Sequence, residues 1–270
     1  MAVRNKRKRG GIRTTPYAKD PSGGSTRGET IRFRGSNEFR HRVLFAAISG
    51  RPIIISDIRK DDESPGVKDF EASLLQLVDT LSSGSTVSIN ETGTKMRYTP
   101  GTIEGGYDLK HACPASRGMG YYLEPLILLC LFAKRNTQIT LSGVTDSPGD
   151  LCVDSIRNVM AWLPNQFGLE EKITVKVLAR GLNPKGGGKV MVTIPIVKQL
   201  KPISLLDCGK IKRFRGVAYV CRCSPQFANR MVSSARSILN KFIPDVYIVT
   251  DHCKGKEAGE SSGFGISLTA

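Results

Sequence analysis

Hydrophobic and polar residues follow the periods of strands and helices along most of the chain. Short runs rich in β-branched residues, typical of strands, are separated by stretches in which apolar residues recur every three or four positions, as on one face of a helix. The first series predicts, in order, a strand, a helix, a strand, a helix and two strands, at residues 30–34, 39–50, 52–58, 67–81, 85–90 and 94–100. The second helix of this series carries its apolar stripe at Phe70, Leu74, Leu77, Val78 and Leu81.

The same order of patterns then occurs again. The second series predicts a strand at 107–111, a long helix at 115–134, a strand at 138–144, a helix ending at 167–168, and strands at 171–179 and 189–197. The tripeptide Ser-Pro-Gly precedes the second helix in both series, at 64–66 and 147–149. We therefore predict an α/β (α+β) fold with two tandem β-α-β-α-β-β repeats, 29–104 and 105–197, whose helices pack on mixed sheets in a large domain, 29–197.

The pattern changes after Lys198 to a shorter β-α-β-β series. Its elements are predicted at 211–223, 224–242, 245–252 and 263–270. We interpret residues 198–270 as a separate, small α/β domain.

Positive charge is concentrated at the N-terminus but is not confined to it. The chain has 40 Lys and Arg against 24 Asp and Glu, a formal net charge of +16. Residues 1–28 have almost no apolar content and are predicted to be a disordered basic tail. Within this tail, RNKRKRGG is typical of a nuclear import signal or of an arm that contacts RNA phosphates. The remaining excess lies on segments expected to fold, which favours a polyanionic partner such as nucleic acid.

Several classes of protein are disfavoured by composition. The longest apolar run, residues 126–133, is far shorter than the roughly 20 residues of a membrane span, so we expect no membrane association. Seven irregularly spaced cysteines suit a reducing compartment. No Cys or His spacing fits a zinc site, so we expect no metal and no cofactor.

The stretch RGLNPKGGGKV, residues 180–190, allows two interpretations, a phosphate-binding loop or a hairpin turn. A phosphate-binding loop of the Walker type needs Ser or Thr after its lysine and then a helix. Here Val190 follows Lys189, and a strand pattern follows in turn. The glycines are therefore predicted to lie at the turn of an antiparallel hairpin.

This stretch resembles R-G-x-x-P-x-G-G-G-x-[LIV], the signature of the RNA 3'-terminal phosphate cyclase superfamily. The signature turn is Gly181, Pro184, Gly186, Gly187 and Gly188. The resemblance runs from about Arg32 to the last residue and implies repeated β-α-β-α-β-β units with a small inserted α/β domain. Residues 113–124, 209–255 and 261–268 are most similar to the nucleolar, cyclase-like branch of the superfamily.

The same resemblance shows positions at which this chain differs from true cyclases, which adenylylate a histidine with ATP. Asn37 and Glu124 stand where the cyclases have glutamines. Their nucleophilic histidine lies in a third repeat, and we expect this repeat to be absent because the chain ends at Ala270. The histidines of this chain, His41, His111 and His252, are no convincing substitutes. We therefore expect no catalytic residue.

The cyclase-like branch implies a non-catalytic ribosome biogenesis factor of the nucleus and nucleolus. The resemblance implies that such a factor belongs to the small-subunit processome. It also implies that the factor is required for the early pre-rRNA cleavages that lead to 18S rRNA. The implied partners are a large nucleolar GTPase, pre-rRNA with its snoRNP, and other pre-ribosomal proteins. Arg40 and Arg59 match arginines of the cyclase pocket. For RNA phosphate binding we predict Arg40, Arg59, Arg117, Arg180, Lys185, Lys189, Lys210, Lys212, Arg213 and Arg215.

An RNA-processing enzyme is the alternative. Asp57, Asp61, Asp62 and Glu63 lie near Arg59 and could hold metal ions of a pre-rRNA endonuclease if they converge in space. An ATP-dependent RNA 3'-phosphate cyclase is the less favoured form of this alternative.

Overall fold

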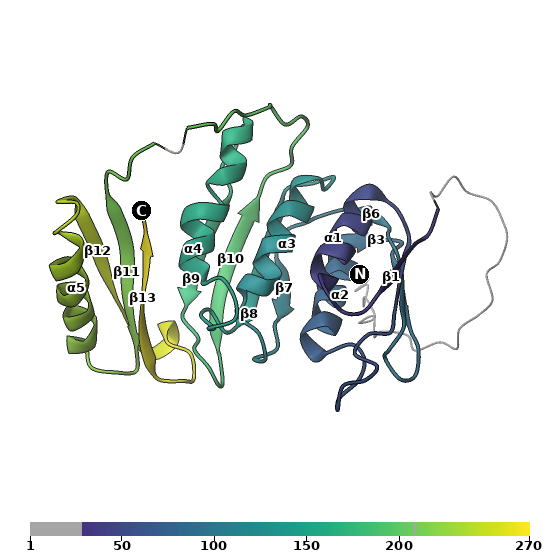
Figure 1. Cartoon of the computed structure of the whole chain (residues 1–270), viewed down its shortest axis with the longest axis horizontal. Coiled ribbons are helices and arrows are strands. Elements are labelled where there is room, and N and C mark those ends of the chain that lie inside the picture. Colours follow the sequence, from purple (N-terminus) through teal and green to yellow (C-terminus); the bar gives the residue numbers. More distant parts are fainter. Residues whose placement is uncertain (1–28, 208) are drawn as a thin grey trace, which may run out of the picture. The chain divides into compact units, whose positions relative to one another are not determined.

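A computed structural model describes residues 29–207 and 209–270, and the predicted disordered tail, 1–28, lies outside these residues. The chain divides into two units, Met1–Thr102 and Ile103–Ala270. Figure 1 shows the course of the chain through both. Within the described ranges, no helix combines the length and the apolar character needed to cross a membrane.

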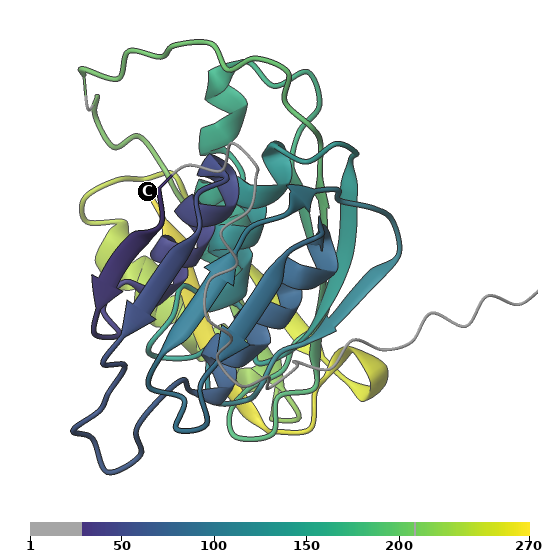
Figure 2. The ribbon, with the colours of Figure 1, turned by 90° about the vertical axis from the view of Figure 1, so that its right-hand side faces the viewer.

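The first unit contains a four-stranded mixed sheet with two helices on one face (Figure 1). Its elements are β1 (Ile31–Arg34), α1 (Phe39–Ser49), β2 (Ile53–Ser56), α2 (Asp69–Leu81), β3 (Ser82–Ser83), β4 (Thr86–Ile89) and β5 (Met96–Thr99). The sheet order is β1-β2-β5-β4, in which β1 and β2 are parallel and the other pairs antiparallel. The purple strand β1 lies at the edge of this sheet in Figure 2. Gly50 ends α1 in a left-handed conformation, as its place after the apolar stripe predicts.

The second unit repeats this arrangement. After β6 (Thr102–Ile103) come β7 (Leu109–Ala112), α3 (Gly120–Leu131), β8 (Thr137–Gly143), α4 (Val153–Ser155), β9 (Thr174–Ala179) and β10 (Gly188–Ile194). Their sheet order, β7-β8-β10-β9, has the same connectivity as β1-β2-β5-β4. The predicted β-α-β-α-β-β repeats with helices on mixed sheets are therefore confirmed.

The small α/β element follows in the same unit. A three-stranded sheet in the order β12-β11-β13 is formed by β11 (Phe214–Cys221), β12 (Val246–Cys253) and β13 (Gly263–Thr269), with α5 (Gln226–Leu239) packed against it. The compact units divide between Thr102 and Ile103. The predicted division into a large and a small domain at residue 198 stays a prediction.

Two predicted helices of the second repeat are shorter than expected. The helix predicted at 115–134 begins only at Gly120, because the Gly118 N–H donates to the Asp150 carboxylate (2.8 Å) and the Met119 N–H to the Val144 carbonyl (2.7 Å). The helix predicted to end at 167–168 is broken into α4, a π-helical turn (Ile156–Met160) and a 3-10 turn (Leu163–Phe167). Pro164, which has no N–H to donate, lies in the last of these.

The signature stretch forms the connection of an antiparallel hairpin, as predicted, because β9 pairs with β10. Its glycines allow backbone segments to approach more closely than a side chain would permit. A Cβ on Gly181 would collide with the Gly188 nitrogen and would lie 2.5 Å from the Gly143 carbonyl oxygen. Gly186 and Gly187 also have φ of 70° and 81°, a left-handed conformation that favours glycine.

The arginine of the signature is buried beneath this hairpin. Arg180 is only 2% exposed, and its guanidinium donates from Nη1 to Asp154 and from Nε to Asp251, each at 2.7 Å. It also lies 4.5 Å over the ring centre of Tyr219. Burial acts to lower the pKa of Arg180, but the hydrogen bonds and charges of Asp154 and Asp251 outweigh this effect and raise it. Because Tyr219 and Asp251 belong to β11 and β12, Arg180 joins the small sheet to the second repeat.

Replacing Arg180 with alanine is expected to destabilise the second unit by about 3–5 kcal/mol, because buried carboxylates would lose their partner. Arg180→Lys should fall between wild type and Arg180→Ala, since an ammonium keeps the charge but not the planar fork. Urea denaturation followed by circular dichroism measures the order. The control, Arg215→Ala, removes an exposed pair and should leave the midpoint nearly unchanged. Equal midpoints for Arg180→Ala and wild type would contradict the structural role.

A methyl group at Gly181 is expected to cost about 1–3 kcal/mol of unfolding free energy, because the atoms that it meets are backbone and cannot move aside. The matched control is Gly149→Ala, whose Cβ would meet no atom within 4 Å. Thermal unfolding of the two variants checks this. If Gly181→Ala were as stable as Gly149→Ala, the close approach in the hairpin would not be required.

Candidate nucleic-acid interface

The two four-stranded sheets contain basic residues but no Asp or Glu. The strands of the first sheet carry Arg32, Arg34 and Arg97. Those of the second sheet carry Lys110, Lys176 and Lys189. Each sheet therefore has a positive formal charge that no acidic residue of its own strands offsets.

All three lysines of the second sheet point away from its helices. One row of neighbouring residues crosses the four strands as Lys110, Thr140, Met191 and Lys176. The flanking residues Ile139, Leu141, Val190 and Val192, which alternate with this row, are completely buried on the opposite, helix-covered face. Lys189 lies in the next row, beside Ser142. We call this solvent-facing surface, defined by Lys110, Thr140, Ser142, Lys176, Lys189 and Met191, the open face.

The lysines of the open face are available to a ligand. Lys110, Lys176 and Lys189 are all exposed, and none takes part in the ion pairs found between described residues. Lys110 and Lys176 are separated by three strand spacings, or about 14 Å, so they can contact different phosphates of one RNA strand. Thr140 adds a hydroxyl between them, and the Ser142 hydroxyl, which donates to the His111 carbonyl at 3.5 Å, can accept a hydrogen bond beside Lys189. The open face can thus bind a polyanion through charge and hydrogen bonds.

The first sheet has cations at corresponding positions. In its register Arg32 and Arg97 flank Ile54 in a row that ends at Ser88. Arg32 corresponds to Lys110, since each is the second residue of the first strand of its repeat. The duplication of the fold therefore extends to the charge of its sheet faces.

The structure places the predicted residues of the signature hairpin differently from one another. Lys185 and Lys189 are exposed, and Lys189 belongs to the open face. Arg180 is 2% exposed and held in its carboxylate cluster, which gives it a structural role, and its predicted contact with RNA stays a prediction. Among the turn residues, Pro184 and Gly187 are exposed, whereas Gly181, Gly186 and Gly188 are buried by close backbone packing.

Two further arginines predicted to bind phosphate are held by carboxylates of the protein. Arg59 donates from both terminal nitrogens to Glu71, at 2.8 and 2.6 Å, and Glu71 is 99% buried (1% exposed) at the start of α2. Arg117 donates to Asp150 at 2.9 and 2.5 Å and lies 4.7 Å over the ring centre of Tyr121. The hydrogen bond with Asp150 raises the pKa of Arg117. These arginines fix loop structure through their carboxylate partners, and their assignment as phosphate ligands stays a prediction.

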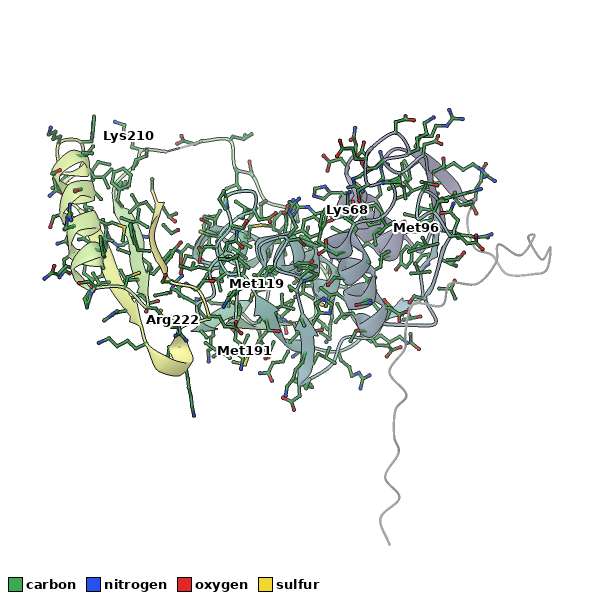
Figure 3. All side chains as sticks on the ribbon, turned by 90° about the horizontal axis from the view of Figure 1, so that it is seen from below. Lys68, Met96, Met119, Met191, Lys210 and Arg222 are labelled. Carbon is green, nitrogen blue, oxygen red and sulfur yellow. The ribbon has the colours of Figure 1, made fainter. Side chains whose placement is uncertain are left out.

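Arg40 lies half-buried in α1. In the small element, Lys210, Lys212 and Arg213 are exposed and line a hollow of about 630 Å³. Lys210 is labelled beside the small sheet in Figure 3. Arg215, the fourth predicted cation there, is held by both oxygens of Asp245 at 2.8 and 2.9 Å. Three cations of this second predicted patch therefore face solvent.

The acidic residues considered for an endonuclease occupy the exposed loop after β2. Asp57, Asp61, Asp62 and Glu63 are all exposed. Across residues 29–207 and 209–270, no group of three or more His, Cys, Asp or Glu side chains is arranged to hold a metal ion. The four carboxylates thus do not converge on a metal site in this structure.

Two features of the open face were missed by sequence reasoning, namely Lys110 and Lys176. Each is the polar residue of an alternating strand, and each faces solvent across the sheet from the other. The absence of acidic residues from the strands was not visible in the sequence, because the predicted strands 52–58, 107–111 and 171–179 include Asp57, Asp108 and Glu171, which lie just outside the observed strands. Only the observed strand bounds and register show that the cations share a face without acidic neighbours.

Comparison with known proteins identifies the family of the chain. Residues 31–256 match the family described as RNA 3'-terminal phosphate cyclase. The chain is 49% identical over 247 residues to an RNA 3'-terminal phosphate cyclase-like protein of Mus musculus, covering 91% of this chain and 66% of the relative. A probable cyclase-like protein of Dictyostelium discoideum is 47% identical over 89% of this chain and 65% of its own length. The rRNA processing protein rcl1 of Schizosaccharomyces pombe is 45% identical over 90% of this chain and 67% of its own length.

The chain thus spans about two thirds of the length of the curated relatives that it matches. The family match covers most of the chain, including both repeats and the signature hairpin. The fold, the signature and these relatives lead to one conclusion: the chain belongs to the RNA 3'-terminal phosphate cyclase family, among relatives named cyclase-like.

Proposed function

We propose that this protein is a non-catalytic ribosome biogenesis factor that binds pre-rRNA during its processing. The observation that carries the proposal is the open face, where three exposed lysines lie on a sheet without acidic residues. The Schizosaccharomyces pombe relative, named an rRNA processing protein, supports the choice of rRNA as the polyanion. The net charge of +16 is in keeping with such a ligand.

The finer parts of the proposal concern the setting in which the whole protein works. We place it in the nucleolus, in the small-subunit processome, where the early cleavages leading to 18S rRNA take place. A large nucleolar GTPase, snoRNP and other pre-ribosomal proteins are the proposed partners. These parts depend on the family resemblance.

RNA binding follows from elementary electrostatics. Each lysine that contacts a phosphate releases condensed counterions, so that affinity comes from charge and falls with salt. Hydroxyl groups of Thr140 and Ser142 hydrogen-bond without reading bases. The expected ligand is therefore an RNA strand bound with weak sequence preference, positioned by the sheet rather than recognised base by base.

A holding role is favoured over chemistry at RNA ends. Arg59 and Arg117, which could have stabilised a transferring phosphate, are each neutralised by a carboxylate at hydrogen-bond distance. Glu124 adds a carboxylate where the true cyclases have an amide. His111 is half-buried, and burial lowers its pKa. These features favour a scaffold for RNA.

Charge reversal of the open face, Lys110→Glu with Lys176→Glu and Lys189→Glu, is expected to weaken RNA binding more than tenfold near 0.1 M salt. If all three lysines contact phosphates, the slope of log affinity against log salt should become shallower by about 2 for single-stranded RNA. Fluorescence anisotropy with a labelled pre-rRNA spacer oligonucleotide measures both quantities. The matched control replaces the same lysines with arginine and should retain binding. Unchanged affinity of the glutamate variant, with an intact circular dichroism spectrum, would refute the role of the open face.

An RNA-processing enzyme would form or break covalent bonds, either by adenylylation of the protein or by cleavage of RNA. A non-catalytic RNA-binding factor would do neither. Incubation with radiolabelled ATP is expected to leave the protein without a stable adenylyl group. Incubation with spacer RNA and Mg²⁺ or Mn²⁺ is expected to leave the RNA intact, because Asp57, Asp61, Asp62 and Glu63 are solvated loop residues. Cutting that disappears in an Asp61→Asn, Asp62→Asn variant would establish the endonuclease instead.

A further inference from the structure

Among the described residues, 29–207 and 209–270, the strand β1 has one neighbour in its sheet, β2, and its other edge is unpaired. The N–H groups of Ile31 and Gly35 donate toward β2, to the carbonyls of Pro52 and Ser56, each at 2.9 Å. Because backbone groups alternate between the two sides of a strand, the N–H and C=O of Arg32 point to the free edge. An added strand would find backbone partners there.

An apolar groove runs between this edge strand and α1. It has a volume of about 610 Å³, and Ile31, Phe33, Phe45, Ala46 and Ile53 form its apolar walls. Phe45 is 60% exposed, and Ile48, on the next turn of α1, is 37% exposed. Exposed large apolar side chains beside an open strand edge are typical of a binding surface. We call this feature the β1 groove.

Hydrogen bonds from Arg42 determine which backbone groups of β1 remain open to an added strand. Arg42 lies 4.8 Å over the ring centre of Phe33 and donates to the Gly35 carbonyl at 2.8 Å and to the Arg34 carbonyl at 3.3 Å. The Arg34 carbonyl is thus already an acceptor within the protein. The free hydrogen-bonding positions of the edge are therefore centred on Arg32, and an added strand would align with this residue.

Charge selects the kind of strand that fits. The side chains of Arg32 and Arg34 lie on the face of the sheet opposite the groove, because they alternate with Ile31 and Phe33. The Arg34 side chain is 88% exposed, and the nearest carboxylate, Asp57, is 3.9 Å away. Pairing of two copies of β1 would bring arginines together on one face, which is destabilising. A strand with carboxylates at alternate positions would instead place them beside both arginines.

We propose that the β1 groove binds an extended segment of a partner protein in which apolar and acidic residues alternate. The segment adds to the free edge of β1 as a strand, a recurring mode of peptide recognition. Its apolar side chains enter the groove against Phe33 and Phe45, while its carboxylates lie beside Arg32 and Arg34. The four-residue strand β1 spans about 13 Å, so about four residues of the partner segment pair with it. An RNA strand would use the arginines but would leave the apolar groove unfilled.

The test uses the full chain and a capped, fluorescent seven-residue peptide that alternates valine and glutamate. Saturable binding by anisotropy is expected. Phe45→Glu should weaken it about tenfold or more, because it places a charge in the groove. The matched control is Phe242→Glu, which alters a phenylalanine that is 76% exposed after α5 and should have no effect. The double variant Arg32→Glu, Arg34→Glu should no longer bind the valine–glutamate peptide. It should instead bind a peptide that alternates valine and lysine.

Several results would overturn the proposal. Equal binding to wild type and Phe45→Glu would show that the groove is not used. Equal binding of a peptide with methylated backbone nitrogens would exclude strand addition. A dimer lost in Phe45→Glu, with no peptide binding, would identify a second copy as the occupant, and binding of an apolar dye alone would identify a small ligand. Loss of RNA affinity but not of peptide affinity in the double arginine variant would assign those arginines to RNA. None of these results depends on whether the open face binds RNA.

Discussion

The buried guanidinium of Arg180 is the interaction on which the second unit depends. It lies where the β9–β10 hairpin, the segment after β8 and two strands of the small sheet meet, and it bonds to Asp154 and Asp251. A buried charge is tolerated only when its hydrogen bonds are satisfied, so these elements must be placed together. The glycine that follows, Gly181, allows the backbone of Gly188 to lie against it. The signature stretch of this chain thus forms a junction between two sheets.

Basic residues are divided between two tasks in this fold. Arginines at loop ends turn inward to carboxylates, as Arg59 does to Glu71 and Arg117 to Asp150. The planar fork of arginine suits such paired, half-buried geometry, whereas the strongly hydrated ammonium of lysine suits an exposed face. Lysines accordingly occupy the open face, on strands without acidic residues, where their field adds rather than cancels. In the second repeat, internal stability and attraction for a polyanion therefore use different cations, whereas the exposed face of the first sheet carries arginines, Arg32 and Arg34.

The architecture was predictable because its signals are local. Alternation in β9 and β10, the valine and isoleucine positions facing the helices and Gly50 after α1 each depend on a few neighbouring residues. The ion pairs were not predictable, since Arg117 and Asp150 are 33 residues apart and Arg180 and Asp251 are 71 apart. The late start of α3 has the same origin, because a distant carbonyl and carboxylate take the N–H groups that would have opened the helix. The sequence shows the charge of a residue but not its burial. Arg180 and Lys189 were therefore both predicted to bind RNA phosphate, although Arg180 is buried and Lys189 is exposed.

We propose that RNA lies on the helix-free face of the second sheet. Photo-crosslinking of the full chain to a pre-rRNA spacer carrying 4-thiouridine, followed by mass spectrometry of the crosslinked peptides, tests this most directly. We expect crosslinks in the strands that contain Lys110, Lys176 and Lys189, with few in the loops of Arg59 and Arg117. Crosslinks confined to those loops or to the helices, with none in the strands of the open face, would contradict it.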